Sequence, residues 1–172
     1  TDKRFVSNFK DGAWDEGVMT GDDQITMSEC ACVLQYAQTV FEGLKAYTTE
    51  DGRVLCFRPD MNAKRMHDSA ERLEMPPFPE DRFVEAVVET VKENIDYVPP
   101  YGTGAALYIR PYMFGSDAVI GVKPANEYQF RILVTPVLLL EHISRVALSR
   151  SRFVYLILIV PLLMEQVILK PA

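Results

Sequence analysis

Residues that commonly bind metals are scarce in this sequence. It contains two histidines and three cysteines among 172 residues, and the spacing Cys30-Ala-Cys32 is a poor fit to a metal-binding motif. The odd number of cysteines fits thiols in a reducing compartment, so we expect Cys30, Cys32 and Cys56 to be buried or half-buried. A redox pair of Cys30 and Cys32 is the alternative. The sequence therefore predicts no metal site and a cytoplasmic protein.

A net positive charge and an apolar run long enough to cross a bilayer are also lacking. The formal net charge of −6 at pH 7 argues against binding to the phosphate backbone of nucleic acids. The apolar run Phe153–Leu163 contains Pro161 and is shorter than the roughly 20 residues needed to cross a bilayer. No charged start is followed by an apolar core and a cleavage site, so we expect no export signal. We therefore expect neither nucleic acid nor a membrane as a partner.

What the sequence does contain, up to about Val137, is the mixed pattern of a folded domain, in a chain that is 48% hydrophobic and 24% charged. Its periodicity and turn signals predict a hairpin of two strands, two helices and two further strands. These elements are expected at Glu42–Thr48, Val54–Phe57, Asn62–Leu73, Asp81–Tyr97, Ala105–Phe114 and Tyr128–Val137. We therefore expect an α+β fold with a mainly antiparallel sheet and flanking helices over residues 1–137.

Two arginines stand out by their surroundings. Arg65 lies on a predicted helix, and its fork of donors suits a phosphate, although a helix-surface arginine in water is the alternative. Arg110 lies in an apolar and aromatic strand, where an unpaired charge is costly. A structural ion pair is the plain explanation for Arg110. From the residues alone, the helix-surface role is favoured for Arg65.

Three segments in order carry a family resemblance. They are Tyr36-Ala-Gln-Thr-Val-Phe41-Glu42-Gly43-Leu44-Lys45-Ala46-Tyr47, Phe57-Arg58-Pro59-Asp60-Met61-Asn62-Ala63-Lys64-Arg65-Met66, and Leu107-Tyr108-Ile109-Arg110-Pro111 followed by Ile120-Gly121-Val122. Together they resemble the branched-chain amino-acid aminotransferases, which are pyridoxal-phosphate enzymes of fold type IV. The resemblance runs from about Asn8 to Val137 and implies the small N-terminal domain of that fold. It implies amino transfer between leucine, isoleucine or valine and 2-oxoglutarate, and a homodimer for the full-length family member.

The resemblance also implies roles for individual residues. Arg65 matches the arginine that holds the cofactor phosphate, and Arg110 matches one that binds the side-chain carboxylate of glutamate or 2-oxoglutarate. Val122 matches a position on a loop that reaches the partner subunit's site. The positions that match the substrate pocket are Tyr36, Phe41, Tyr108 and Val122, although aromatic residues at strand spacing are more often part of a core. Lys45 does not match the family's Schiff-base lysine, which lies much later in the chain.

The sequence departs from the family pattern after Val137. Read one nucleotide earlier, codons for Glu141–Leu148 can encode Gly-Thr-Tyr-Phe-Lys-Gly-Gly-Ala, a string typical of the family. In that frame the catalytic lysine would straddle the codons of Leu169 and Lys170, so Lys170 itself is not that lysine. We interpret residues 138–172 as an out-of-frame tail. The chain then lacks the base that transamination requires, and its binding of pyridoxal phosphate is in question.

Two other functions remain open from the sequence alone. One is another enzyme of the same fold, a D-amino-acid aminotransferase or an aminodeoxychorismate lyase. The other is a non-catalytic truncated product that at most associates with full-length subunits.

Overall fold

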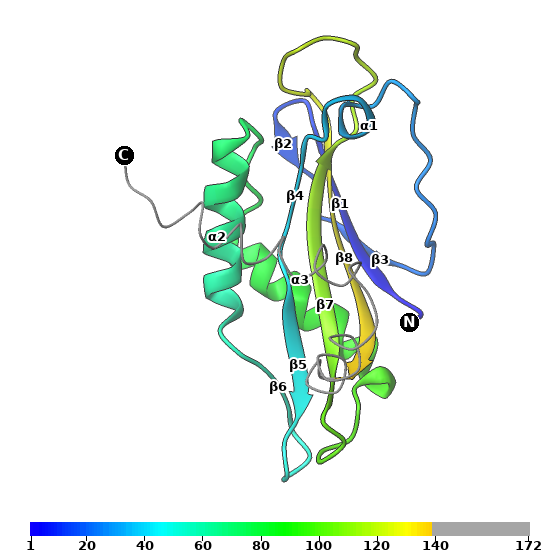
Figure 1. Cartoon of the computed structure of the whole chain (residues 1–172), viewed down its shortest axis with the longest axis vertical. Helices are drawn as coiled ribbons and strands as arrows, with labels where there is room; N and C mark the ends of the chain where they lie inside the picture. Colours follow the sequence, from blue (N-terminus) through cyan, green and yellow to red (C-terminus); the bar gives the residue numbers. More distant parts are fainter. Residues whose placement is uncertain (139–172) are drawn as a thin grey trace, which may run out of the picture. The chain divides into compact units, whose positions relative to one another are not determined.

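A curled antiparallel sheet of eight strands is the centre of the fold (Figure 1). The computed structural model describes residues 1–138, within which Thr1–Val137 form one compact unit. The main path of the sheet is β2-β1-β8-β7-β5-β6, with β3 paired to β1 and β4 paired to β7. The strands are β1 (Arg4–Lys10), β2 (Ala13–Trp14), β3 (Val18–Thr20), β4 (Thr39–Phe41), β5 (Leu44–Thr48), β6 (Val54–Cys56), β7 (Ala105–Gly115) and β8 (Tyr128–Leu138). The expected α+β fold is confirmed.

Both predicted helices form, with shifted ends. The first, α2 (Pro59–Arg72), begins at Pro59, whose missing N–H is no loss in the first turn of a helix. The second, α3 (Glu80–Lys92), buries the side chains that recur at helical spacing, including Phe83, Val87 and Val91. It ends earlier than expected, and a short 3-10 turn, η1 (Ile95–Tyr97), follows it. The buried Asn94 donates hydrogen bonds to the carbonyls of Thr90 and Lys3 at this end.

The first 41 residues contain elements that the sequence patterns did not predict. They are β1 to β4 and the short helix α1 (Cys32–Tyr36). β1 pairs with β8, so that Phe5 lies opposite Ile132 and Phe9 opposite Tyr128. β1 also forms a tight hairpin with β2 through Asp11-Gly12, both with positive φ, a local turn signal that the expected elements left out.

Aromatic side chains fill the space between the sheet and α3. Phe130 on β8 is fully buried, and its ring stacks on that of Phe78 with 4.0 Å between centroids. Phe83 of α3 lies 5.8 Å from the Phe130 ring, and Phe5 of β1 lies 6.1 Å from it. Phe130 therefore joins two strands, a helix and the segment between α2 and α3. No helix within residues 1–138 has both the length and the apolar character that crossing a bilayer demands.

We expect Phe130→Ala to lower the free energy of unfolding by about 3–5 kcal/mol, because it removes apolar contacts and leaves a cavity. Phe57→Ala is the control, since Phe57 is 79% exposed and its loss should cost less than about 0.5 kcal/mol. Denaturant unfolding followed by tryptophan fluorescence measures both. Similar losses for the two variants would contradict this description of the core.

Candidate active site

A proline interrupts the hydrogen-bond ladder in the middle of the sheet. β4 and β5 pair with β7 in one continuous register, with Phe41 opposite Tyr112 and Leu44 opposite Ile109. Between these pairs the Glu42 N–H donates to the Pro111 carbonyl at 2.9 Å. Pro111 has no N–H to return a bond, so the ladder is open at this point. For this reason the single predicted strand Glu42–Thr48 is wrong in its first two residues.

The alternation of the strands sends Glu42 and Gly43 to opposite faces of the sheet. Glu42 faces the side where Leu44 and Ala46 are buried, and its carboxylate contacts α2. Gly43 faces the other side, opposite Arg110 in the shared register. The open ladder therefore lies between two groups of polar side chains.

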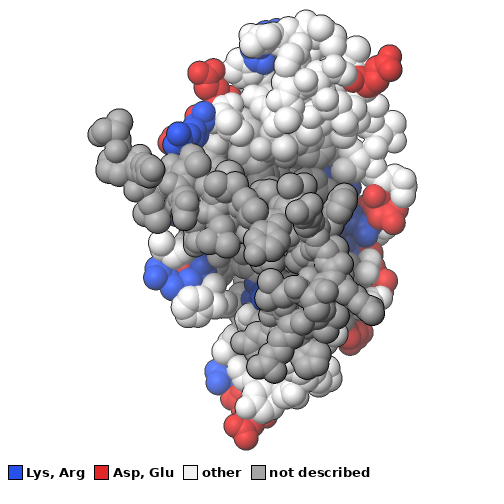
Figure 2. Space-filling model, viewed as in Figure 1, with Lys and Arg blue, Asp and Glu red and all other residues white. Residues whose placement is uncertain are grey.

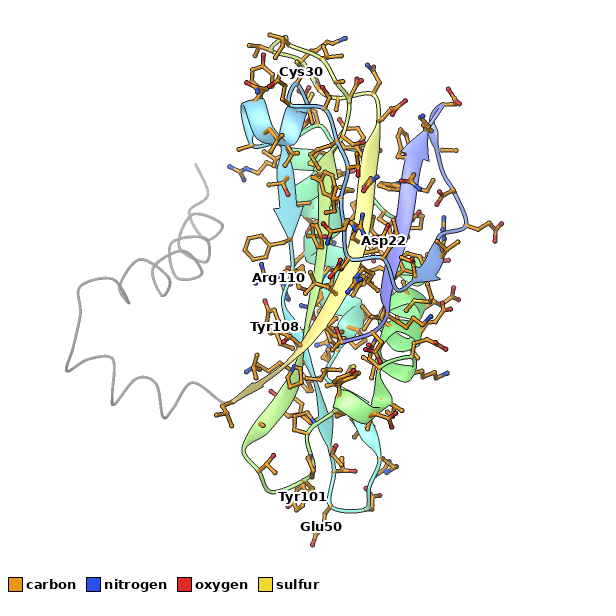
Figure 3. The ribbon with its side chains drawn as sticks, turned by 90° about the vertical axis from the view of Figure 1, so that its right-hand side faces the viewer. Asp22, Cys30, Glu50, Tyr101, Tyr108 and Arg110 are labelled. Carbon is orange, nitrogen blue, oxygen red and sulfur yellow. The ribbon has the colours of Figure 1, made fainter. Side chains whose placement is uncertain are left out.

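The first group is centred on Arg110, which is half-buried on the face away from α3 (Figure 3). Its Nε and Nη2 donate to the Tyr108 hydroxyl at 3.1 and 2.7 Å. Its guanidinium carbon lies 4.3 Å from the centre of the Phe41 ring, a cation–π contact. Within the described residues, no carboxylate lies within ion-pair distance of Arg110. A positive charge held by neutral partners can accept an anionic ligand.

Gly43 makes room for this group. A Cβ atom at residue 43 would collide with the Tyr108 hydroxyl and lie 3.1 Å from Tyr108 Cζ. The side chain that moved would be the one that holds Arg110. Gly43 is therefore required by close approach, not by an unusual backbone conformation.

The second group is centred on Glu42, whose side chain is only 13% exposed. Arg65 donates from Nε to Glu42 Oε1 at 3.0 Å and from Nη2 to Oε2 at 2.9 Å. Asn62, one turn earlier on α2, donates to Oε2 at 2.7 Å and to the Gly43 carbonyl at 3.3 Å. The Arg65 side chain remains 52% exposed, so the guanidinium is fixed on one edge and accessible on the other.

The remaining two candidates lie at one end of the sheet. Tyr36 is the last residue of α1 and is 40% exposed, and Val122 lies in the connection between β7 and β8 and is 97% exposed. Leu34 and Ile120 are exposed on the same elements. Figure 2 shows that this end of the molecule is largely uncharged. The described residues include no contact that joins Tyr36 or Val122 to Arg110 or Arg65.

Several polar residues near these groups had no role predicted from the sequence. Glu42 and Asn62 stood in the quoted motifs, but their contacts depend on a helix packing against a distant strand. Tyr112 shares the face of Arg110, and burial raises the pKa of its hydroxyl while the charges of Arg131 and Arg4 partly offset this rise. Arg131 is itself buried and donates to Gln129 Oε1 at 3.2 Å. The sequence offered one signal for Arg131, which is its position as an arginine in an otherwise mainly apolar strand.

The cysteines are free thiols, with Cys32 buried and both Cys30 and Cys56 half-buried. Burial raises the pKa of the Cys56 thiol, which keeps it in its less reactive neutral form. Within residues 1–138, no group of three histidine, cysteine, aspartate or glutamate side chains is arranged to hold a metal ion.

Comparison with known proteins decides the family. Residues 39–155 match the family model described as amino-transferase class IV. The chain belongs to this family. A branched-chain-amino-acid aminotransferase of Haemophilus influenzae is 48% identical to this class IV chain over 137 residues, which are 80% of the chain and 40% of that relative. The chain thus spans about two fifths of the length of this relative.

Solved structures give the same result for the fold of this class IV domain. The Escherichia coli branched-chain amino acid aminotransferase superposes with a TM-score of 0.59 at 25% identity, covering 78% of this chain and 41% of that one. A second branched-chain amino acid aminotransferase, complexed with N-(5'-phosphopyridoxyl)-L-glutamate, gives a TM-score of 0.55 at 28% identity. That match covers 75% of this chain and 40% of the other. The expectation of a fold type IV N-terminal domain is confirmed.

We expect Gly43→Ala to lower the free energy of unfolding by about 1–3 kcal/mol, because the new methyl group displaces the Tyr108 ring. Gly121→Ala is the matched control, since its nearest neighbour would lie at 3.9 Å and the change should stay within about 0.5 kcal/mol. Thermal unfolding measures both variants. NMR of the Arg110 Nε–H should show a shifted signal only in Gly43→Ala, and an unchanged signal would show that Tyr108 does not hold this arginine.

Proposed function

We propose that residues 1–137 are the small domain of a cytoplasmic, pyridoxal-phosphate-dependent transaminase. Its reaction is amino transfer between leucine, isoleucine or valine and 2-oxoglutarate, and the full-length enzyme is a homodimer. The observation that carries this proposal is the Arg110 guanidinium, held on an open sheet face by Tyr108 and Phe41 without a carboxylate partner in the described residues. The branched-chain aminotransferases among the relatives support the choice of substrate.

The donor geometry of Arg65 fits the cofactor phosphate. Glu42 engages Nε and one N–H of Nη2, which leaves both N–H groups of Nη1 and the second of Nη2. These donors form a second fork on the exposed edge, and such a fork matches two phosphate oxygens. When bound, pyridoxal phosphate supplies the electron sink for chemistry at the substrate's α-carbon. Arg65 would contribute binding and orientation of the phosphate.

Arg110 would set which side chains the pocket accepts. A pocket for both leucine and glutamate must tolerate an apolar group and a carboxylate in one place. The Phe41 ring, 52% exposed, offers apolar surface next to the guanidinium. The Tyr108 hydroxyl accepts two hydrogen bonds from Arg110, so its own proton is directed elsewhere and can be donated to a carboxylate. Tyr36 and Val122 would complete the pocket, Val122 by extending toward the partner subunit.

We propose further that residues 138–172 are read out of frame and that this polypeptide alone does not transaminate. The support is the departure from the family pattern after Val137, and these residues lie outside the described part of the structure. The family match itself continues to residue 155, so the reading frame of residues 138–172 has to be established from the gene. Sequencing across the codons of residues 137–172 tests the proposal. A confirmed frame with no nearby insertion or deletion would refute it.

In the enzyme with its reading frame and downstream sequence restored, we expect Arg110→Ala to reduce kcat/KM for glutamate about tenfold to a hundredfold more than for leucine. Only glutamate brings a second carboxylate, and hydrogen bonds to charged groups contribute about 1.5–3 kcal/mol each. Steady-state kinetics with both amino acids measures the difference.

Arg53→Ala is the control for Arg110→Ala, since Arg53 is exposed beside the hairpin turn and pairs with Asp51. Equal losses for glutamate and leucine in Arg110→Ala would show that Arg110 is structural. Activity with D-amino acids, or lyase activity on aminodeoxychorismate, would favour the other enzymes of this fold. Absence of activity in the chain as it stands, beside an active restored enzyme, would favour the non-catalytic truncated product.

A further inference from the structure

Glu42 is a nearly buried carboxylate with two partners on one helix. Burying a charge is costly unless hydrogen bonds and an opposite charge compensate it. Here Asn62 and Arg65 provide both, through three donated bonds of 2.7 to 3.0 Å. The cost of burial therefore makes this arrangement specific, because displacing Arg65 would leave the carboxylate without its counter-charge.

The backbone around Glu42 is fixed as well. The Glu42 N–H is bound to the Pro111 carbonyl, and the Gly43 carbonyl accepts from Asn62. Asn62 is only 6% exposed and lies one turn before Arg65, on the same face of α2. Strand and helix are thus joined at the residue that holds the arginine. A long side chain that is half exposed would otherwise sample many rotamers.

We propose that Glu42, supported by Asn62, is the positioning residue for Arg65, and that it presents the outer edge of the guanidinium to the cofactor phosphate. This inference rests on the proposed phosphate-binding role of Arg65. Glu42 does not touch the phosphate. It occupies the inner edge of the guanidinium and leaves the outer fork as the only set of Arg65 donors available to an anion.

Two effects of Glu42 on phosphate affinity oppose each other. Its negative charge repels an anion, while fixing the arginine lowers the entropy lost when the anion binds. The repulsion acts across the guanidinium, whose positive charge lies between the two anions and offsets it. The loss of rotamer freedom in a long arginine side chain has no such offset. Positioning should therefore dominate.

The experiment uses the full chain with its arginine side chains labelled with 15N. NMR relaxation of the Arg65 Nε–H reports how rigidly the guanidinium is held, without any ligand. Titration with inorganic phosphate, and with pyridoxal 5'-phosphate against pyridoxal, reports binding at the same signal. The variants are Glu42→Gln, which keeps the shape and one acceptor, and Glu42→Ala. Asp60→Asn is the matched control, since it removes the same charge from the start of α2, where Asp60 pairs with exposed Arg58.

We expect Arg65 to be rigid in the wild type and in Asp60→Asn, less rigid in Glu42→Gln and fully mobile in Glu42→Ala. Affinity for pyridoxal 5'-phosphate should fall about threefold to tenfold in Glu42→Gln relative to Asp60→Asn, the range that freed rotamers would produce. If Glu42→Ala does not fold, Glu42→Gln and an Asn62→Ala variant decide the question.

Each contrary outcome has a distinct meaning. Unchanged Arg65 rigidity and unchanged affinity in Glu42→Gln would overturn the positioning role. Tighter binding in Glu42→Gln than in Asp60→Asn would also overturn it, because Glu42 would then compete with phosphate for Arg65. A wild-type chain whose Arg65 signal does not respond to phosphate or pyridoxal 5'-phosphate would instead overturn the proposed role of Arg65, and the inference with it.

Discussion

The missing hydrogen bond at Pro111 is the constraint on which both polar groups depend. A proline in a strand that has neighbours on both sides leaves one carbonyl without its ladder donor. Here that gap lies opposite Glu42, and it separates β4 from β5 although their register with β7 is continuous. The two residues at the gap have roles other than strand pairing. Glu42 holds Arg65 through its nearly buried carboxylate, and Gly43 leaves space for Tyr108 beside Arg110.

The two arginines are held by different chemistry, and this difference matches their proposed ligands. Arg65 has a full negative counter-charge on one edge, which fixes it while the other edge stays exposed. Arg110 has a hydroxyl and an aromatic face as neighbours, so its positive charge is only weakly compensated. In the proposed enzyme the cofactor phosphate would stay in place, whereas the substrate carboxylate would have to be exchanged with an apolar group. A pre-positioned arginine suits the first ligand, and one with neutral neighbours tolerates both states of the second.

The sequence predicted the parts of the fold that local patterns encode. The helical spacing of Phe83, Val87 and Val91 located α3, and the turn at Asp51-Gly52 located the hairpin of β5 and β6. It did not predict β1, which pairs with β8 at the other end of the described chain, and the Asp11-Gly12 turn that joins β1 to β2 was overlooked. The family resemblance singled out Arg65 and Arg110, but not Glu42 and Asn62 as the residues that surround Arg65. Those contacts arise only when α2 packs beside the interrupted ladder, and no periodicity in the sequence predicts that packing.

In the function proposed above, this domain presents two prepared anion sites, one for a phosphate and one for a carboxylate. A single ligand carries both groups: N-(5'-phosphopyridoxyl)-L-glutamate. Titrating it into the arginine-labelled chain and following every Nε–H signal by NMR is the most direct measurement. We predict that the signals of both Arg65 and Arg110 shift, the first with the phosphate and the second with the glutamate carboxylate, while that of Arg53 stays still. Shifts confined to one of the two arginines, or spread evenly over exposed arginines, would contradict the claim.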